Sequence, residues 1–189
     1  MKNIAIFASG NGTNAERIMG FFSDHDDINI QLVLTNNPKA GVIARAQKFN
    51  VTCRIFTREE FYHSDKIDKI LKDNNIDFIV LAGFLWLIPS SVIQAFPGRI
   101  INIHPALLPK YGGKGMFGHH VHEAVIANKE TQSGITIHYV NEHYDEGNII
   151  FQATCEVKKD DTPDTLAARI HELEYTHFPV VIEKLLEEL

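Results

Sequence analysis

The feature that most constrains the fold is a regular alternation of short apolar runs with amphipathic segments. Residues 3–8 form an Ile-rich and nearly continuous apolar run, which is typical of a strand buried on both faces. In residues 15–22 the apolar side chains recur at helical spacing, which indicates a helix with one buried face. Because strand and helix alternate in this way, we expect a parallel sheet with helices on both of its faces.

The same patterns place the remaining elements. Further strands are predicted at residues 28–34, 51–56, 77–82, 99–103, 134–140 and 148–157, and further helices at 42–49, around 67–71 and at 117–127. A last helix is expected from Thr162 to Leu186, because a hydroxyl residue followed by proline is a frequent helix start, and Pro179 is expected to bend or restart it. The predicted fold class is α/β, a doubly wound and mostly parallel seven-stranded sheet flanked by helices, with a Rossmann-like N-terminal half.

Composition narrows the class of protein. The chain has 189 residues, of which 44% are hydrophobic and 22% charged, as expected for a single globular domain. A net charge of −6 argues against a dedicated nucleic-acid-binding protein but not against a small anionic ligand in a locally basic pocket. No apolar stretch is long enough to cross a membrane, and we expect no secretory leader before the first strand. Two cysteines, Cys53 and Cys155, make no disulfide framework, so we expect a cytoplasmic protein.

A glycine-rich turn follows the first predicted strand. Its sequence is Ser-Gly-Asn-Gly-Thr-Asn, residues 9–14, and it precedes a predicted helix. Glycines let the backbone approach an anion closely, and a helix N-terminus offers unpaired N–H groups to it. The sequence therefore predicts a phosphate site here, although a tight turn without a ligand would need the same residue types.

Dinucleotide binding is the main alternative for this turn. Gly10, Gly12 and Ala15 fit the spacing of that fingerprint, but the fold also needs an acidic residue at the end of the second strand to bind the ribose. Here that strand ends in Leu-Thr-Asn-Asn, residues 34–37. Because Asn14 also supplies a side-chain donor that suits a phosphate monoester, we favour a phosphorylated small molecule.

Three polar side chains are candidates for chemistry. Asn102 and His104 alternate with apolar residues at the end of a predicted strand, so they face the same side, unless they are only a satisfied polar pair. Asp145 lies in a polar loop, where a carboxylate is usually just solvated. If the fold brings Asp145 to His104, the carboxylate is expected to raise the pKa of the imidazole from about 6.5 toward physiological pH.

These residues give the sequence a clear resemblance to a known family. Three segments carry it: residues 9–14, Leu-Ala-Gly-Phe at 81–84, and Asn-Ile-His-Pro-Ala-Leu-Leu-Pro-Lys-Tyr at 102–111. Asp145 and Gly147 agree in position. The chain resembles the folate-dependent formyltransferases over nearly its whole length.

The resemblance implies transfer of a formyl group from 10-formyltetrahydrofolate, a co-substrate, to the primary amine of glycinamide ribonucleotide in purine biosynthesis. It implies that Asn102 and His104 hydrogen-bond the negative oxygen that forms, and that Asp145 tunes the histidine and helps to move the proton. Preorganised donors aimed at such an oxygen are the expected source of catalysis. No metal and no nucleic acid are implied, and the protein is expected to be a monomer or homodimer.

The resemblance also assigns binding residues. For the ribonucleotide they are Gly10, Asn11, Gly12, Thr13, Asn14, Lys110 and Glu174, with Lys114 as a further cation. For the folate they are Arg58, Leu85, Trp86, Leu87, Ile88, Asn102, Asn141, Glu142, His143, Tyr144 and Asp145. On sequence alone, solvent-exposed side chains would be the simpler interpretation of the two lysines and of Glu174. Residues 1–100 would then be the phosphate-binding half, and residues 101–189 the catalytic and folate-binding half.

Some residues differ from the pattern of this family, and other functions are considered as alternatives. Many family members carry Met-Arg where this chain has Leu85 and Trp86, and the glycine-rich segment 112–118 is longer than in many relatives and is expected to be a mobile flap. The histidines at 119, 120 and 122 could suggest a metal, but structural zinc usually needs four ligands. A tRNA-formylating or a folate-hydrolysing relative would need an additional domain. A nucleotide-binding module without catalysis is the alternative of a different class.

Overall fold

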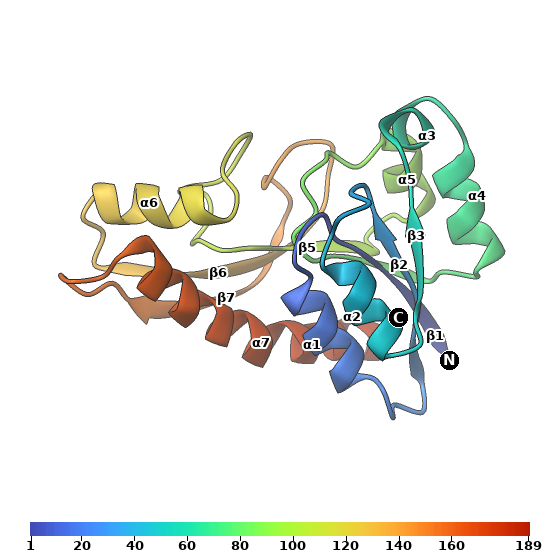
Figure 1. Cartoon of the computed structure of the whole chain (residues 1–189), viewed down its shortest axis with the longest axis horizontal. Helices are drawn as coiled ribbons and strands as arrows, with labels where there is room; N and C mark the ends of the chain where they lie inside the picture. The colour runs from blue at the N-terminus through green and yellow to red at the C-terminus, as the bar shows by residue number, and fades with distance from the viewer.

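The computed structural model describes residues 1–189 and contains one seven-stranded sheet (Figure 1). The order of strands across the sheet is β3-β2-β1-β4-β5-β6-β7. The first five strands in this order are parallel to one another, whereas β6 pairs antiparallel with β5 and β7 pairs antiparallel with β6. The strands are β1 (Lys2–Phe7), β2 (Ile28–Thr35), β3 (Thr52–Ile55), β4 (Phe78–Leu81), β5 (Ile100–His104), β6 (Gln132–Tyr139) and β7 (Ile149–Glu156). The prediction of a mostly parallel seven-stranded sheet is confirmed.

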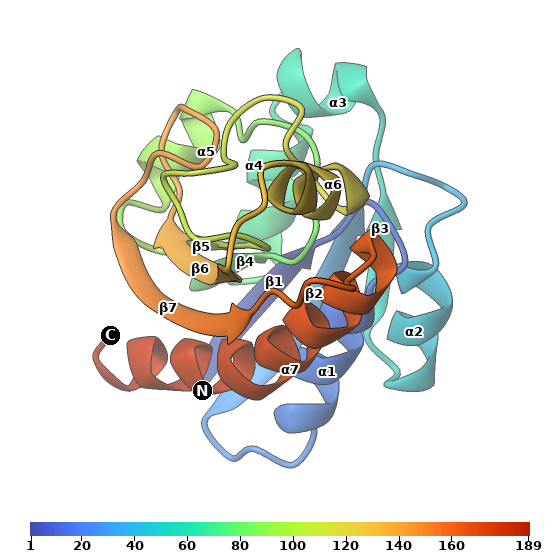
Figure 2. The ribbon, with the colours of Figure 1, turned by 90° about the vertical axis from the view of Figure 1, so that its left-hand side faces the viewer.

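Helices cover both faces of the sheet (Figure 2). Buried residues of α1, α2, α6 and α7 belong to one apolar cluster, and those of α3, α4 and α5 to a second cluster. The helices are α1 (Thr13–Phe21), α2 (Val42–Lys48), α3 (Arg58–Tyr62), α4 (Lys66–Asp73), α5 (Ser90–Ala95), α6 (His119–Ala127) and α7 (Pro163–Glu187). None of these helices is both long and apolar enough to cross a membrane.

The central strand β1 shows why its sequence is apolar without alternation. Ile4 and Ile6 pack into the first cluster, while Ala5 and Phe7 pack into the second, and all four are fully buried. Successive side chains of a strand point to opposite faces, so a strand covered on both sides must be apolar throughout. The same holds for β4, whose four residues are all buried.

The arrangement of β1 and β4 positions the site. The chain passes from β1 to β2 on one side and later returns to pair β4 on the other side of β1. The connections leave these two neighbouring strands in opposite directions, which opens a crevice beyond their carboxyl ends. Residues 10–14 follow β1 and residues 82–88 follow β4, so both segments lie at this crevice.

The long last helix corrects one prediction. Pro179 was expected to bend or restart it, but α7 is helical without interruption from Pro163 to Glu187, so the restart is wrong. Pro179 has no N–H for the carbonyl of Tyr175, one turn earlier. Arg17 on α1 donates its Nε–H to that carbonyl at 3.1 Å, which satisfies the acceptor that proline leaves free.

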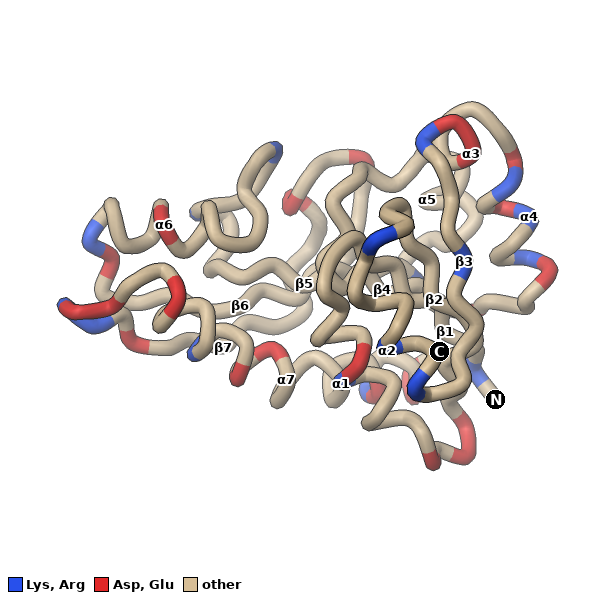
Figure 3. The backbone as a smooth tube through the Cα atoms, viewed as in Figure 1, with Lys and Arg blue, Asp and Glu red and all other residues tan.

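Charged residues of both signs are intermixed along the chain rather than gathered by sign, as the traced backbone shows (Figure 3). Two elements were not predicted, the short helices α3 and α5. The strand predicted at 99–103 extends one residue further, so that His104 is its last residue instead of the first of the loop. This extension fixes the backbone of His104 in the sheet.

Candidate active site

A cavity of about 580 Å³ lies at the carboxyl ends of β1, β4 and β5. This volume is in the usual range of small-molecule sites. Five chain segments contribute to its wall, and individual side chains are added by α6, by α7 and by β6 with the residue after it. The lining consists of residues 10–14, 81–88, 102–105, 113–118 and 143–145, with His122, His138, Val140, His171 and Glu174.

The glycine turn forms one end of the cavity. Gly12 has a φ of 76° and precedes α1, and a Cβ atom there would lie 2.5 Å from Cβ of Val42. Glycine is therefore required at residue 12 both for the left-handed backbone and for the packing of α2 against the turn. Arg45 of α2 fixes the turn further, because its Nε–H donates to the carbonyl of Asn11 at 2.7 Å.

Glu174 of α7 faces the same end of the cavity. Its side chain accepts hydrogen bonds from Nδ2 of Asn14 at 2.9 Å and from the ring of His171 at 2.8 Å. Only 4% of Glu174 is exposed, so the solvated helix carboxylate that sequence alone favoured is wrong. The hydrogen bond with Glu174 raises the pKa of His171, which burial by itself would lower.

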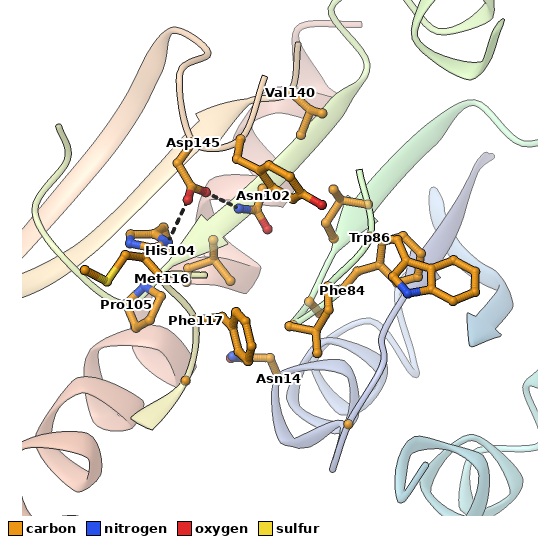
Figure 4. Close-up of a pocket in the computed structure, with 18 of the residues that line it drawn as sticks. Asn14, Phe84, Trp86, Asn102, His104, Pro105, Met116, Phe117, Val140 and Asp145 are labelled. Atoms are coloured by element: carbon orange, nitrogen blue, oxygen red, sulfur yellow. Dashed lines mark hydrogen bonds and ion pairs between the residues drawn. The ribbon is translucent and has the colours of Figure 1, made fainter. Parts of the chain in front are cut away.

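Two side chains of β5 meet a carboxylate from a distant loop in the middle of the cavity (Figure 4). Nδ1 of His104 lies 3.5 Å from Oδ2 of Asp145, and Nδ2 of Asn102 lies 3.5 Å from Oδ1 of the same carboxylate. Asn102 and His104 both line the cavity, as their alternation in the strand predicted. The fold therefore brings Asp145 to His104, as a chemical role for this carboxylate requires.

The pKa of His104 differs from the expected one. Asp145 was expected to raise it, but the pKa is lowered from its usual value, because removal of the ring from water outweighs the attraction of the carboxylate. The ring is 3% exposed. Its Nε2 is 2.7 Å from the carbonyl oxygen of Tyr111, so both ring nitrogens face protein acceptors. Both acceptors favour the protonated ring, but burial has the larger effect, so His104 is mainly neutral near pH 7.

Asp145 is held as a carboxylate. Burial opposes its ionisation, but the nearby rings of His138 and His104 and the backbone N–H of Gly113 together lower its pKa. That N–H donates to Oδ2 at 2.9 Å. Asp145 itself has a φ of 58°, in the left-handed region, which carboxylate side chains tolerate better than most. A negative charge thus lies beside a neutral imidazole.

His138 also belongs to this group, although no motif in the sequence pointed to it. Its Nε2 lies 3.1 Å from Nδ2 of Asn102 and 3.6 Å from Oδ1 of Asp145. His138 is opposite Asn102 in the pairing of β5 with β6. The signal was present in the alternation of β6, where Thr136 and His138 share a face opposite to two isoleucines, but the register of two distant strands was needed to use it.

The other end of the cavity is more apolar. Residues 85–88 line it together with Val140 and Tyr144, and the N–H of Leu85 donates to Oγ of Ser9 at 3.0 Å. That bond ties this segment to the glycine turn. The indole of Trp86 lies on the side away from His104 (Figure 4) and packs against Phe56, Phe61 and Tyr62.

Four candidate residues are not brought to the cavity. Lys110 lies outside the lining, with its ammonium 2.9 Å from Oε1 of Glu130. The guanidinium of Arg58 stacks over the rings of Tyr62 and Trp86, at 5.3 and 5.6 Å from their centroids. Asn141 and Glu142 do not line the cavity either, although the next residues, 143–145, do. The second lysine considered, Lys114, does line it.

The glycine-rich segment 112–118 contributes residues 113–118 to the wall. Phe117 of this segment lines the cavity (Figure 4) and is exposed. The mobility expected of this segment stays a prediction. His119 and His120, at the start of α6, contact Glu123 on the same helix, and no group of three or more His, Cys, Asp or Glu side chains has a metal-binding arrangement.

Comparison with known proteins gives consistent results. A family model described as formyl transferase matches residues 2–182. The chain is 39% identical over 193 residues to the chloroplastic phosphoribosylglycinamide formyltransferase of Arabidopsis thaliana, which covers 99% of this chain and 66% of that protein. It is 37% identical over 191 residues to the phosphoribosylglycinamide formyltransferase of Bacillus subtilis, covering 98% of this chain and 95% of that protein.

Solved structures show the same likeness. The crystal structure of phosphoribosylglycinamide formyltransferase from Bacillus halodurans superposes with a TM-score of 0.88 at 35% identity, covering 98% of this chain and 95% of that one. The protein of that name from Streptococcus pneumoniae gives 0.86 at 34% identity, covering 98% and 99%. The chain spans about two thirds of the length of the plant relatives that it matches. Sequence, fold and site thus agree, and the chain belongs to the formyl transferase family.

Proposed function

We propose that this protein transfers the formyl group of 10-formyltetrahydrofolate to the primary amine of glycinamide ribonucleotide, a step of purine biosynthesis. One observation carries the proposal. Asn102, His104 and Asp145 converge between a glycine turn suited to a phosphate and a largely apolar wall suited to a pterin. The relatives named phosphoribosylglycinamide formyltransferase support the choice of substrates.

The ribonucleotide would bind at the end of the cavity formed by residues 10–14. Backbone N–H groups at the start of α1 suit the phosphate, and the left-handed Gly12 shapes the turn. Glu174, held by Asn14 and His171, would accept hydrogen bonds from the substrate, at its glycinamide end by the family resemblance. Lys110 is no longer part of the proposal because its ammonium is paired with Glu130.

The folate would bind at the other end. Residues 85–88 offer backbone groups and apolar side chains, and His143 and Tyr144 face them. Trp86 replaces the arginine of many relatives and packs into an aromatic cluster, so pterin binding here would depend on the backbone of this segment. Arg58, Asn141 and Glu142 lie outside the cavity, and we leave them out of the proposed folate site.

The three central residues would then act on the transfer. Attack of the amine nitrogen on the formyl carbon forms the new C–N bond and leaves a negative charge on the formyl oxygen. Asn102 would donate to that oxygen. His104 would take the proton lost by the amine, and the carboxylate of Asp145 would stabilise the imidazolium, 3.5 Å away. Return of the proton to the departing folate nitrogen breaks the old C–N bond and gives tetrahydrofolate.

Location and domain division are inferred as well. We infer a cytoplasmic location, which is supported by two free cysteines whose thiol pKa values are raised by burial. The division at residue 100 into a phosphate-binding and a catalytic, folate-binding half is supported by the positions of the turn and of the three central residues. Residues 85–88 depart from it, because they line the folate end from the first half. Gel filtration would decide between monomer and homodimer.

The direct test is an assay with both substrates. Consumption of 10-formyltetrahydrofolate, followed by absorbance, should require glycinamide ribonucleotide and should yield formylated amine in equal amount. Formyl loss at the same rate without the ribonucleotide would indicate a hydrolase instead. Binding of nucleotide without any affinity for the folate would indicate a binding module.

A further inference from the structure

The catalytic histidine is fixed by a backbone carbonyl. Nε2 of His104 lies 2.7 Å from the carbonyl oxygen of Tyr111. A carbonyl can only accept a hydrogen bond, so the proton of the neutral imidazole must be on Nε2. Nδ1 then carries the lone pair and faces Asp145 at 3.5 Å. Whatever fixes the position of this carbonyl also fixes which nitrogen of His104 can receive a proton.

The backbone of Tyr111 is in an unusual conformation. Its φ is 58°, in the left-handed region that bulky side chains rarely adopt. Such a conformation persists only where the surroundings hold it. Two features hold Tyr111: its side chain packs against the first apolar cluster, and its hydroxyl donates to Oε1 of Glu130 at 2.8 Å.

Glu130 is well placed to anchor this tyrosine. It lies in the short connection between α6 and β6, and its N–H donates to the carbonyl of Val125 at 3.2 Å. Lys110 donates to the same Oε1 at 2.9 Å. Hydrogen bonds from the lysine and the tyrosine lower the pKa of Glu130, so the anchor is a carboxylate at neutral pH.

We propose that Glu130 and Tyr111 are positioning residues that hold the carbonyl of Tyr111 against Nε2 of His104 and so direct Nδ1 to Asp145. Neither residue lines the cavity, and Glu130 would act on the reaction only through Tyr111. The inference rests on the proposed function for its kinetic consequence. Its structural part, the proton on Nε2 of His104, does not depend on any substrate.

The first experiment therefore needs no substrate. In wild-type protein labelled with ¹⁵N at histidine, NMR should show His104 with its proton on Nε2. In Tyr111→Phe and Glu130→Ala that signal should move toward a mixture of tautomers. The groups that face His104 are Asp145, His138 and Glu174, and all three remain in both variants. An unchanged His104 signal in folded Tyr111→Phe would overturn the proposal.

The second experiment measures formyl transfer. Tyr111→Phe and Glu130→Ala should each lower kcat on the order of 10- to 100-fold, as expected for a displaced catalytic group, with KM for both substrates unchanged. The double variant should be no slower than the slower single one, because both changes break the same chain of contacts. Glu130→Gln, which keeps an acceptor for the tyrosine hydroxyl, should recover most of the lost kcat.

Controls separate this role from general destabilisation. Glu183 pairs with His25 away from the cavity, and its side chain is 31% exposed, against 26% for Glu130. Glu183→Gln therefore removes a carboxylate of similar exposure. It should leave kcat and the His104 signal unchanged. The proposal would be contradicted if the losses of kcat in the two single variants multiplied in the double variant. It would also be contradicted if KM rose while kcat stayed constant. If the wild type shows no transfer but the NMR result holds, only the proposed function fails.

Discussion

At the scale of residues, the three central side chains have different chemical roles. Asn102 has a neutral donor, His104 a neutral ring that receives a proton, and Asp145 a carboxylate that stabilises the result. His104 and Asn102 each lie 3.5 Å from an oxygen of Asp145, so these groups can interact more strongly when charge develops on the substrate. Each is therefore expected to matter more in the transition state than in the binding of substrate.

Replacement of any of the three by alanine should lower kcat on the order of 100- to 1,000-fold without unfolding the protein. Asp145→Asn should also be slow, because it keeps the size but removes the charge that stabilises protonated His104. Steady-state kinetics with both substrates, together with circular dichroism of each variant, would measure this. Near-normal turnover of purified His104→Ala would remove the histidine from the proposed mechanism.

The burial of His122 on α6 should make the stability of the protein depend on pH. It is 2% exposed, and its pKa is lowered to about 4 by burial and by the positive charge of nearby His171. In the unfolded chain the pKa is about 6.5, so below that pH the unfolded state binds a proton that the folded state does not. The free energy of unfolding is therefore unaffected by this histidine above pH 6.5. It decreases as the pH falls toward 4, by a total on the order of 3 kcal/mol.

The measurement is urea unfolding of wild type and His122→Gln at several pH values. The difference between their free energies of unfolding should shrink steadily from pH 6.5 to pH 4, because the variant lacks the titrating group. Parallel curves over this interval would show that His122 is not held neutral in the folded state.

At the scale of elements, the glycine turn allows a matched comparison. Gly12→Ala places a Cβ atom 2.5 Å from Val42 at a φ of 76°, whereas a Cβ at Gly10 meets no atom within 4 Å. The first change should cost at least about 1–2 kcal/mol of stability, and the second very little. Gly10→Ala should instead weaken binding of the ribonucleotide, because it adds a methyl group inside the phosphate end of the cavity.

Chemical denaturation and a binding titration of both variants would check this. Equal stability losses would mean that packing between α2 and the turn does not depend on Gly12. Unchanged ribonucleotide affinity in Gly10→Ala would place the phosphate elsewhere in the cavity.

Much of the architecture could be predicted from local patterns. All seven strands were found, because a strand buried on both faces, such as β1 or β4, leaves a continuous apolar run. The helices α3 and α5 were missed because each has six residues or fewer, which is too short for a periodic pattern. The effect of Pro179 was predicted wrongly because the carbonyl of Tyr175 is hydrogen-bonded by Arg17, which belongs to a helix distant in the sequence.

The site could be predicted only where motif and geometry coincide. Asn102, His104 and Asp145 were found because two of them alternate in a strand and all three match family positions. The burial of Glu174 depends on Asn14, 160 residues away, and no local pattern shows it. The pKa of His104 was predicted with the wrong sign, because a sequence shows the charge of Asp145 but not the burial of the ring.

At the scale of the whole molecule, the site joins the two ends of the chain. Asn14 on α1 and Glu174 on α7 close one end of the cavity through a hydrogen bond of 2.9 Å. A ligand that binds only the folded protein stabilises it by mass action, by about 2.7 kcal/mol at 100 times its Kd. Glycinamide ribonucleotide should therefore raise the melting temperature of the wild type.

Thermal unfolding with and without the ribonucleotide would measure this shift. In Glu174→Gln the shift should be much smaller, because the neutral amide accepts fewer and weaker hydrogen bonds from the substrate. A full shift in the variant would mean that Glu174 only supports the fold and takes no part in binding.

The proposed function depends most on transfer between two substrates held in one cavity. The most direct measurement is mass spectrometry of the products after the protein is mixed with glycinamide ribonucleotide and 10-formyltetrahydrofolate carrying ¹³C in its formyl group. The ¹³C should appear on the amine of the ribonucleotide, and His104→Ala should slow its appearance. Release of the label as formate, with the ribonucleotide unchanged, would contradict the proposed function.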